Sequence, residues 1–136
     1  MADNEVRSVS ATGAEKGVKD TRMDLVPIGP LRALAAHYGA GAKKYDDRNW
    51  EKGYEWSKSY AALMRHITAF WGGENVDEEG LSHLAAVAFH TFSLMEFSVT
   101  HPEFDDRPGD RAKTEEEREQ AAWNDYTTNL GDDTNE

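Results

Sequence analysis

The segment from Glu78 to Val99 constrains the fold most, because as a helix it would be apolar on nearly every side. Its apolar residues are Leu81, Leu84, Ala85, Val87, Ala88, Phe89, Phe92, Leu94, Met95 and Phe97. A helix that is apolar all round is buried between other helices or between subunits. No alternating strand pattern occurs elsewhere in the 136 residues, so the sequence predicts a single all-α domain around this helix.

One stripe of this helix is different. Glu79, His83, Ala86, His90 and Ser93 follow one another at steps of four, three, four and three residues, which places them along one face. Burying glutamate and histidine costs free energy unless they are paired or bound to a ligand. Glu79 and His83 are therefore interpreted as facing one metal ion or substrate. The alternative is that the two histidines of the stripe are core residues satisfied by backbone or tyrosine groups.

Two further helices are expected before it. Pro30 suits the first turn of a helix with apolar residues at i, i+3, i+4 and i+7, and Gly39 is its expected end. A second, amphipathic helix has Ser57 as its expected N-cap and ends at Gly72. The apolar face predicted for this helix consists of Tyr60, Leu63, Met64, Ile67, Phe70 and Trp71.

The two ends of the chain differ from its centre in composition. Residues 1–22 have few large apolar side chains and are predicted to form a flexible arm. The last 32 residues hold 11 acids and 4 bases, and so contribute −7 to the net charge of −11. We expect residues 101–136 to be an acidic tail with a short helix near 115–124, capped by Thr114, and a mobile final dozen residues. The folded domain is then expected over residues 23–100.

Composition excludes several classes of protein and site. The net charge of −11 argues against binding duplex nucleic acid through its phosphates. There is no cysteine, so a metal ion would be held by oxygen and imidazole ligands, which favours Mg²⁺ or Mn²⁺ over structural zinc. The acidic segment Met1–Glu5 does not resemble a signal peptide, and no apolar run is long enough to span a membrane. A cytoplasmic location is expected.

Four acids are concentrated in the connection that leads into the polar stripe. Glu74 and Asp77 are spaced i, i+3, and Glu78 and Glu79 follow at once. If these carboxylates converge, they repel one another by several kcal/mol, and a divalent cation would remove that cost. The alternative is a solvated, merely hydrophilic loop.

A basic and aromatic segment lies before the second helix. Residues 39–53 mix cations, aromatic residues and glycines without a helical or strand period, and are interpreted as a loop or an irregular turn of helix. Cations opposite a metal cluster are what a triphosphate requires, and aromatic rings can stack on a base or simply pack. The candidate cations are Lys43, Lys44, Arg48 and Arg65, and the candidate rings are Tyr45, Trp50 and Trp71. Periodicity places Arg65 almost opposite the apolar face of its helix, so it is either solvated or turned toward another helix layer or subunit.

Several catalytic motifs are missing from the sequence. There is no His-Asp dipeptide, no phosphate-binding Gly-x-x-x-x-Gly-Lys-[Ser/Thr] loop and no Gly-x-Ser-x-Gly nucleophile turn. With no obvious nucleophile, water activated by a metal ion is the expected reagent.

Seven short motifs together resemble a known family. They are Asp-Leu-Val-Pro (24–27), Tyr-Gly-Ala (38–40), Lys-Tyr (44–45), Asn-Trp-x-x-Gly (49–53), Arg-His (65–66), Gly-Glu-x-x-Asp (73–77) and Gly-Leu-x-His-Leu (80–84). Over residues 19–97 the chain resembles the phage dATP/dGTP diphosphohydrolase domain, a relative of the MazG all-α nucleotide pyrophosphohydrolases. The resemblance implies a MazG-like helical bundle, often a tetramer, that uses Mg²⁺ or Mn²⁺ to convert a deoxynucleoside triphosphate to the monophosphate and pyrophosphate.

The chain looks most similar to the MazZ type of phages that replace adenine with 2-aminoadenine. That similarity implies dGTP as the preferred substrate, dATP as a possible one, and dGMP as a product supplied to modified purine synthesis in the host cytoplasm. MazG enzymes carry two pairs of acids on neighbouring helices. Glu74-x-x-Asp77 resembles one pair, Glu79 with His83 is the nearest substitute for the other, and His66 occupies the place of an acid in the preceding helix.

Two sets of site residues follow from the sequence and the resemblance. The predicted metal-binding and catalytic residues are Glu74, Asp77, Glu78, Glu79 and His83. The predicted substrate-binding residues are Lys43, Lys44, Tyr45, Arg48, Asn49, Trp50, Arg65 and His66. Two alternatives stay open: a non-enzymatic helical module that binds a nucleotide or a protein, and a nucleotide phosphohydrolase that releases inorganic phosphate.

Overall fold

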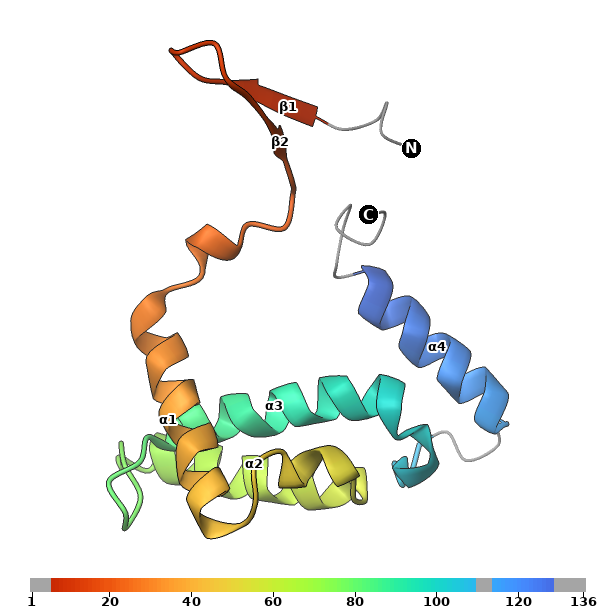
Figure 1. Ribbon diagram of the computed structural model, residues 1–136. Helices are drawn as coiled ribbons and strands as arrows, with labels where there is room; N and C mark the ends of the chain where they lie inside the picture. Colours follow the sequence, from red (N-terminus) through yellow and green to blue (C-terminus); the bar gives the residue numbers. More distant parts are fainter. Residues whose placement is uncertain (1–5, 110–113, 129–136) are drawn as a thin grey trace.

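The computed structural model describes residues 6–109 and 114–128, and the part of the chain it describes is mostly helical, as predicted. Figure 1 shows the elements in chain order. Within these residues the helices are α1 (Ile28–Lys44), α2 (Trp56–Trp71), α3 (His83–Thr100) and α4 (Glu115–Thr128). Strands β1 (Val6–Val9) and β2 (Glu15–Val18) form a hairpin, and η2 (Met23–Leu25), η3 (Asn49–Lys52) and η4 (Pro102–Phe104) are single 3-10 turns.

Helix α3 is the centre of the fold, because α1, α2, α4 and η4 all pack against it. It begins later than predicted, at His83, because the Ser82 side chain accepts a hydrogen bond from the Ala85 amide at 3.1 Å and caps the helix there. Glu79 therefore lies outside the helix, and the prediction that it shares a helical face with His83 is wrong.

The polar stripe of α3 is the face that is buried. His83, Ser93 and Phe97 are 7%, 0% and 0% exposed, and Ala86 between them is 1% exposed. The other side of the helix is open, because Phe92 is 48% exposed. One chain thus covers only part of a helix that is apolar all round.

Helix α2 lies along α3 and starts without a side-chain cap of its own. Ser57 is not the N-cap that the sequence predicted. Instead, its amide donates to Asp106 Oδ1 at 2.9 Å and its hydroxyl bonds to Asp106 Oδ2, so the segment after α3 satisfies the start of α2. The predicted apolar face is only partly right, since Trp71 is 87% and Tyr60 60% exposed.

Helix α1 continues through Gly39, where the sequence predicted its end. The helical bonding runs to the Tyr45 amide, which donates to the Gly41 carbonyl at 2.9 Å. Neither Gly39 nor Gly41 adopts a positive φ, so no turn forms at either glycine. Lys43 and Lys44 consequently sit on the last helical turn rather than in a loop.

The N-terminal arm contains a β-hairpin, so the prediction of an all-α chain is wrong there. Val6 pairs with Val18 and Val9 with Glu15 around a turn in which Gly13 has φ +85°. The strands carry no alternating apolar face and are exposed on both sides, which is why the sequence pattern missed them. The hairpin extends away from the helices (Figure 1).

The C-terminal helix was predicted, but not its full length. The Thr114 side chain accepts a hydrogen bond from the Glu117 amide at 3.2 Å, as the capping box predicts. The helix α4 then extends to Thr128, through residues that were expected to be mobile. Predictions for residues 1–5, 110–113 and 129–136 lie outside the described residues. Over the described ranges, no helix has the length and apolar character to cross a membrane.

His101, which follows α3, connects the end of α3 to the loop before α2 through hydrogen bonds. Its Nε2 lies 2.8 Å from the Glu51 carbonyl oxygen and its Nδ1 lies 2.7 Å from Glu103 Oε1. Both partners can only accept, so only the protonated imidazole satisfies both. The hydrogen bond to Glu103, followed by that to the Glu51 carbonyl, raises the pKa of His101 above its ordinary value.

This contact predicts a pH-dependent stability. Because the pKa of His101 is higher in the folded than in the unfolded chain, its contribution is complete below the unfolded value of about 6.5 and is lost as pH rises through the folded value. Urea unfolding between pH 6 and pH 9 should show the wild type losing stability relative to His101→Gln, which does not titrate. Parallel pH curves for the two proteins would contradict the assignment.

Candidate functional site

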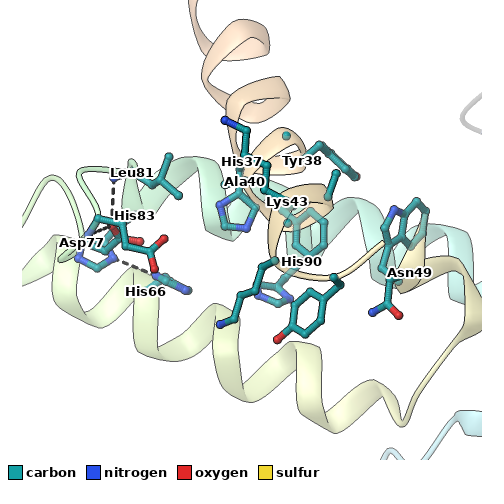
Figure 2. A pocket seen from close by; sticks show the side chains of 18 of the residues that line it. His37, Tyr38, Ala40, Lys43, Asn49, His66, Asp77, Leu81, His83 and His90 are labelled. Carbon is teal, nitrogen blue, oxygen red and sulfur yellow. Dashed lines mark hydrogen bonds between the residues drawn. The ribbon is translucent and has the colours of Figure 1, made fainter. Parts of the chain in front are cut away.

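One cleft gathers all thirteen residues that the sequence analysis selected. It is bordered by the end of α1, the loop that follows, the Arg65–His66 region of α2, the connection into α3 and the first half of α3. Figure 2 shows Asp77, His66 and His83 at one end of the cleft and Tyr38 and Asn49 at the other. The roles assigned to the thirteen residues stay predictions, but their convergence from four separate segments is a property of the fold.

The acidic connection is an ordered turn built around Asp77. Its Oδ1 accepts hydrogen bonds from the amides of Glu79 at 2.8 Å and Leu81 at 3.0 Å, and its own amide donates to the Leu81 carbonyl. A bridge between Val76 and Ser82 closes the turn, and Gly80 adopts φ +82° within it. Partial burial acts to raise the pKa of Asp77, but the hydrogen bonds from Leu81 and Glu79 outweigh it, so the pKa lies below its ordinary value.

Two histidines meet beside this turn. The Nδ1 atoms of His66 and His83 lie 2.9 Å apart, so one ring donates and the other accepts. The buried Nε2 of His83 lies 3.3 Å from Glu74 Oε2 without hydrogen-bond geometry, and has no hydrogen-bond partner in the described chain. Burial, followed by the charge of His83, lowers the pKa of His66. This end of the cleft therefore combines a fixed carboxylate with two imidazoles that share one hydrogen bond.

The remaining acids stand at the rim. Glu74 has 70% of its side chain exposed, and Glu78 and Glu79 lie on the exposed turn. Among the described side chains, no group of three or more His, Asp or Glu is arranged to hold a metal ion. The protein thus offers individual donors on one wall rather than a complete cage.

Two further histidines of the cleft are not among the predicted site residues. His90 lies on the polar stripe of α3, and His37 is hidden in the apolar pattern of α1. Both line the cleft, and His37 Nδ1 is buried without a hydrogen-bond partner in the described residues. Burial lowers the pKa of His37, and it lowers the pKa of His90 to about 4. Only the position of His90 on the stripe could have signalled this pair.

Aromatic side chains line the other end. Phe89 packs against Tyr38 with ring centroids 4.9 Å apart, and Trp50 packs against Phe97 at 6.0 Å. Trp50 is therefore part of the packing of the cleft wall, whereas Tyr45 is 59% exposed. Trp71, also considered for stacking, is 87% exposed on α2 and is not among the residues that border the cleft.

Cations lie around the opening. Lys43 and Lys44 border the cleft from the last turn of α1, and Arg65 borders it from α2, without requiring a second subunit. Arg48 is engaged locally, because its Nη1 lies 2.8 Å from Glu51 Oε1. The cleft is thus a groove with acids and imidazoles at one end, aromatic rings at the other and cations at its edge.

Comparison with known proteins gives one match. The model of a family described as dATP/dGTP diphosphohydrolase, N-terminal, matches residues 10–107, which is well over half of the chain. The match includes helices α1–α3 and every residue of the cleft. No curated protein and no solved structure matches the chain.

Proposed function

Because the chain belongs to the dATP/dGTP diphosphohydrolase N-terminal family, we propose that it hydrolyses a purine deoxynucleoside triphosphate to the monophosphate and pyrophosphate. The observation that carries the proposal is the polarity of this cleft, which has a carboxylate–imidazole end, an aromatic end and cations at its opening. A nucleoside triphosphate has the matching order of an anionic chain and a flat, apolar base.

The cation that this reaction would use is Mg²⁺ or Mn²⁺. The donors fit a cation that arrives with the nucleotide, because Mg²⁺ is usually held by one or two carboxylates together with substrate phosphates. Asp77, with Oδ2 left over from its backbone bonds, and Glu74 would supply the carboxylates, with Glu78, Glu79 and His83 nearby. When bound, the cation neutralises phosphate charge and lowers the pKa of the attacking water.

The remaining residues of the cleft would position the substrate. Lys43, Lys44 and Arg65 would bind phosphates, while Arg48 would first have to leave Glu51. Tyr45 is exposed and would stack on the base, and Trp50 would support the same end from within the wall. Asn49 would read the edge of the base, and the shared hydrogen bond of His66 would orient His83.

We also propose the finer role suggested by the resemblance to the MazZ type. On that proposal dGTP is preferred over dATP, and the dGMP formed feeds the synthesis of a modified purine in a phage. Comparing the rates for dGTP and dATP tests the preference directly.

Product analysis tests the proposed function. We expect the purified chain with Mg²⁺ or Mn²⁺ to release pyrophosphate from dGTP, more slowly from dATP, and from neither once the cation is chelated. Pyrophosphate from none of the four deoxynucleoside triphosphates would overturn the proposal. Inorganic phosphate in its place would identify the phosphohydrolase alternative.

The non-enzymatic alternative makes a different prediction for stability. A ligand that binds only the folded state raises the melting temperature. We expect Mn²⁺ together with a non-hydrolysable dGTP analogue to raise it well beyond the effect of either alone. A module that binds nucleotide through its loop without metal would show the same shift with and without Mn²⁺.

We further propose that the chain forms a homo-oligomer, a dimer or a tetramer. Apolar side chains remain exposed along one stripe of each central helix, and a helix face of this kind is normally covered by a partner. The exposed residues are Tyr60, Met64 and Trp71 on α2, and Leu84, Phe92 and Met95 on α3.

Light scattering after gel filtration tests the assembly. We expect the wild type to exceed the mass of one 15.2 kDa chain and Phe92→Glu to shift toward the monomer. Ala61→Glu makes a similar change at an exposed position of α2 outside the stripe, and should not alter the mass. A monomeric wild type at micromolar concentration would overturn the proposal.

A further inference from the structure

A fully buried serine lies behind the cleft between two residues that line it. Ser59 on α2 is 0% exposed, and its hydroxyl oxygen lies 2.7 Å from the Tyr54 hydroxyl and 3.1 Å from His90 Nδ1. Tyr54 comes from the loop before α2 and His90 from α3, and both border the cleft, whereas Ser59 does not. The three side chains thus form a continuous hydrogen-bond network that connects the protein interior to the cleft wall.

Counting protons shows which group donates in each hydrogen bond of this network. Each hydroxyl has one proton to donate, and Ser59 is the only hydrogen-bond partner of the Tyr54 hydroxyl in the described chain. If Tyr54 donates to Ser59 and Ser59 donates to His90 Nδ1, both protons are used. The reverse order would leave the Tyr54 hydroxyl proton with no acceptor among the described residues, so the order that uses both protons within the protein is favoured. His90 Nδ1 is therefore an acceptor, and the ring carries its proton on Nε2.

His90 is held as a neutral ring at physiological pH. Burial, and after it the nearby charges of His66, His37 and Arg65, lower the pKa of His90 to about 4. Its ring is T-shaped against Phe89 at 5.1 Å and stacked on His66 at 6.2 Å. The Nε2 atom has no hydrogen-bond partner within the described residues, and the ring faces the cleft in Figure 2.

The neutral Nε2–H group of His90 is better suited to an uncharged acceptor on a ligand than to a phosphate. Phosphates are better served by the cations at the opening, whereas His90 adjoins the aromatic cluster of Tyr38, Phe89 and Trp50. The purine edge that carries N7 and the 6-substituent distinguishes the two purines, because guanine presents O6 as an acceptor and adenine presents an amino group as a donor.

We propose that the Nε2–H of His90 donates a hydrogen bond to O6 of a bound guanine and so favours guanine over adenine nucleotides. Tyr54 and Ser59 are positioning residues that hold the ring in the required tautomer and orientation. This inference rests on the proposed function only in taking the ligand to be a purine nucleotide.

The experiment combines nitrogen NMR with nucleotide binding. In the full ¹⁵N-labelled chain at pH 7, His90 is expected to show a neutral ring protonated at Nε2, and that proton should shift when the α,β-methylene analogue of dGTP binds. Calorimetry with the corresponding dGTP, dITP and dATP analogues should show that dITP, which keeps O6, binds nearly as well as dGTP. His90→Phe should lower the preference for dGTP over dATP by about tenfold, the value of one neutral hydrogen bond.

Two variants separate the proposed contact from general damage. His37→Phe changes another half-buried histidine of the cleft, and its preference should stay within twofold of the wild type. Tyr54→Phe should lower the preference in part and broaden or shift the His90 nitrogen signals, even if His90→Phe does not fold.

Each contrary result has a distinct meaning. A His90 ring protonated at Nδ1, or at both nitrogens, at pH 7 overturns the inference. So does an unchanged preference in both the His90 and the Tyr54 variants. Either result leaves the proposed function intact, whereas a chain that binds no purine nucleotide overturns both.

Discussion

Replacing Asp77 with asparagine is expected to lower pyrophosphate release by about 100-fold or more while the fold is retained, because on the proposed function it removes one of the two carboxylates that would hold the divalent cation. Asparagine keeps an oxygen at the place of Oδ1, which accepts the hydrogen bonds from Glu79 and Leu81. The turn should therefore persist, and the melting temperature should change by only a few degrees. Steady-state release of pyrophosphate from dGTP with Mg²⁺, together with a melting curve, measures both effects.

Two comparisons show whether the charge or the turn is responsible. Asp77→Ala removes the acceptor as well, so it should be less stable than Asp77→Asn by about 0.5–1.5 kcal/mol for each lost bond. Asp20→Asn makes the same chemical change outside the cleft and should leave the rate unchanged. An Asp77→Asn enzyme within threefold of the wild-type rate would remove Asp77 from the proposed mechanism.

The sequence predicted the order of the helices and the start of α4, but not where α2 and α3 begin. Local periodicity revealed α1, α2 and α3, because each buries a face at the helical spacing. The start of α2 depends on Asp106, 49 residues beyond Ser57, and a local pattern cannot show that contact. The start of α3 is fixed by the Ser82 cap, and the preceding turn, in which Asp77 accepts from the amides of Glu79 and Leu81, keeps Glu79 outside the helix. The spacing of Glu79 and His83 alone could not show that turn.

The roles of the candidate site residues stay predictions, but the fold brings all thirteen of the predicted metal-binding and substrate-binding residues to one cleft. The chain formed by Tyr54, Ser59 and His90 could not be predicted in the same way, because Ser59 and His90 meet across 31 residues through the packing of α2 on α3. Only the position of His90 on the polar stripe hinted at this arrangement, and the most buried polar residues of the stripe, Ser93 and His83, belong to the core as much as to the site.

Replacing Gly53 with alanine is expected to destabilise the protein by about 3 kcal/mol. Gly53 has φ +84° and ψ 153°, a region open almost only to glycine, and forcing another residue into it costs about 1–3 kcal/mol. An added Cβ would also lie 2.6 Å from Cγ of His101, which cannot move aside freely. That ring is hydrogen-bonded to the Glu51 carbonyl and to the Glu103 carboxylate. The backbone oxygen of His101 also accepts a hydrogen bond from Trp56 Nε1 at 3.1 Å. Urea unfolding measures the loss.

Gly39 provides the matched control, because it lies exposed in the middle of α1 with no atom within 4 Å of an added Cβ. Gly39→Ala should stabilise the protein by about 0.5–1 kcal/mol through its better helix propensity, so the same substitution has opposite signs at the two sites. If the clash with His101 contributes, Gly53→Ala should cost less in a His101→Ala background, leaving only the backbone strain. An equal cost in both backgrounds would assign the whole effect to φ, and no cost in either would show that the loop before α2 does not need glycine.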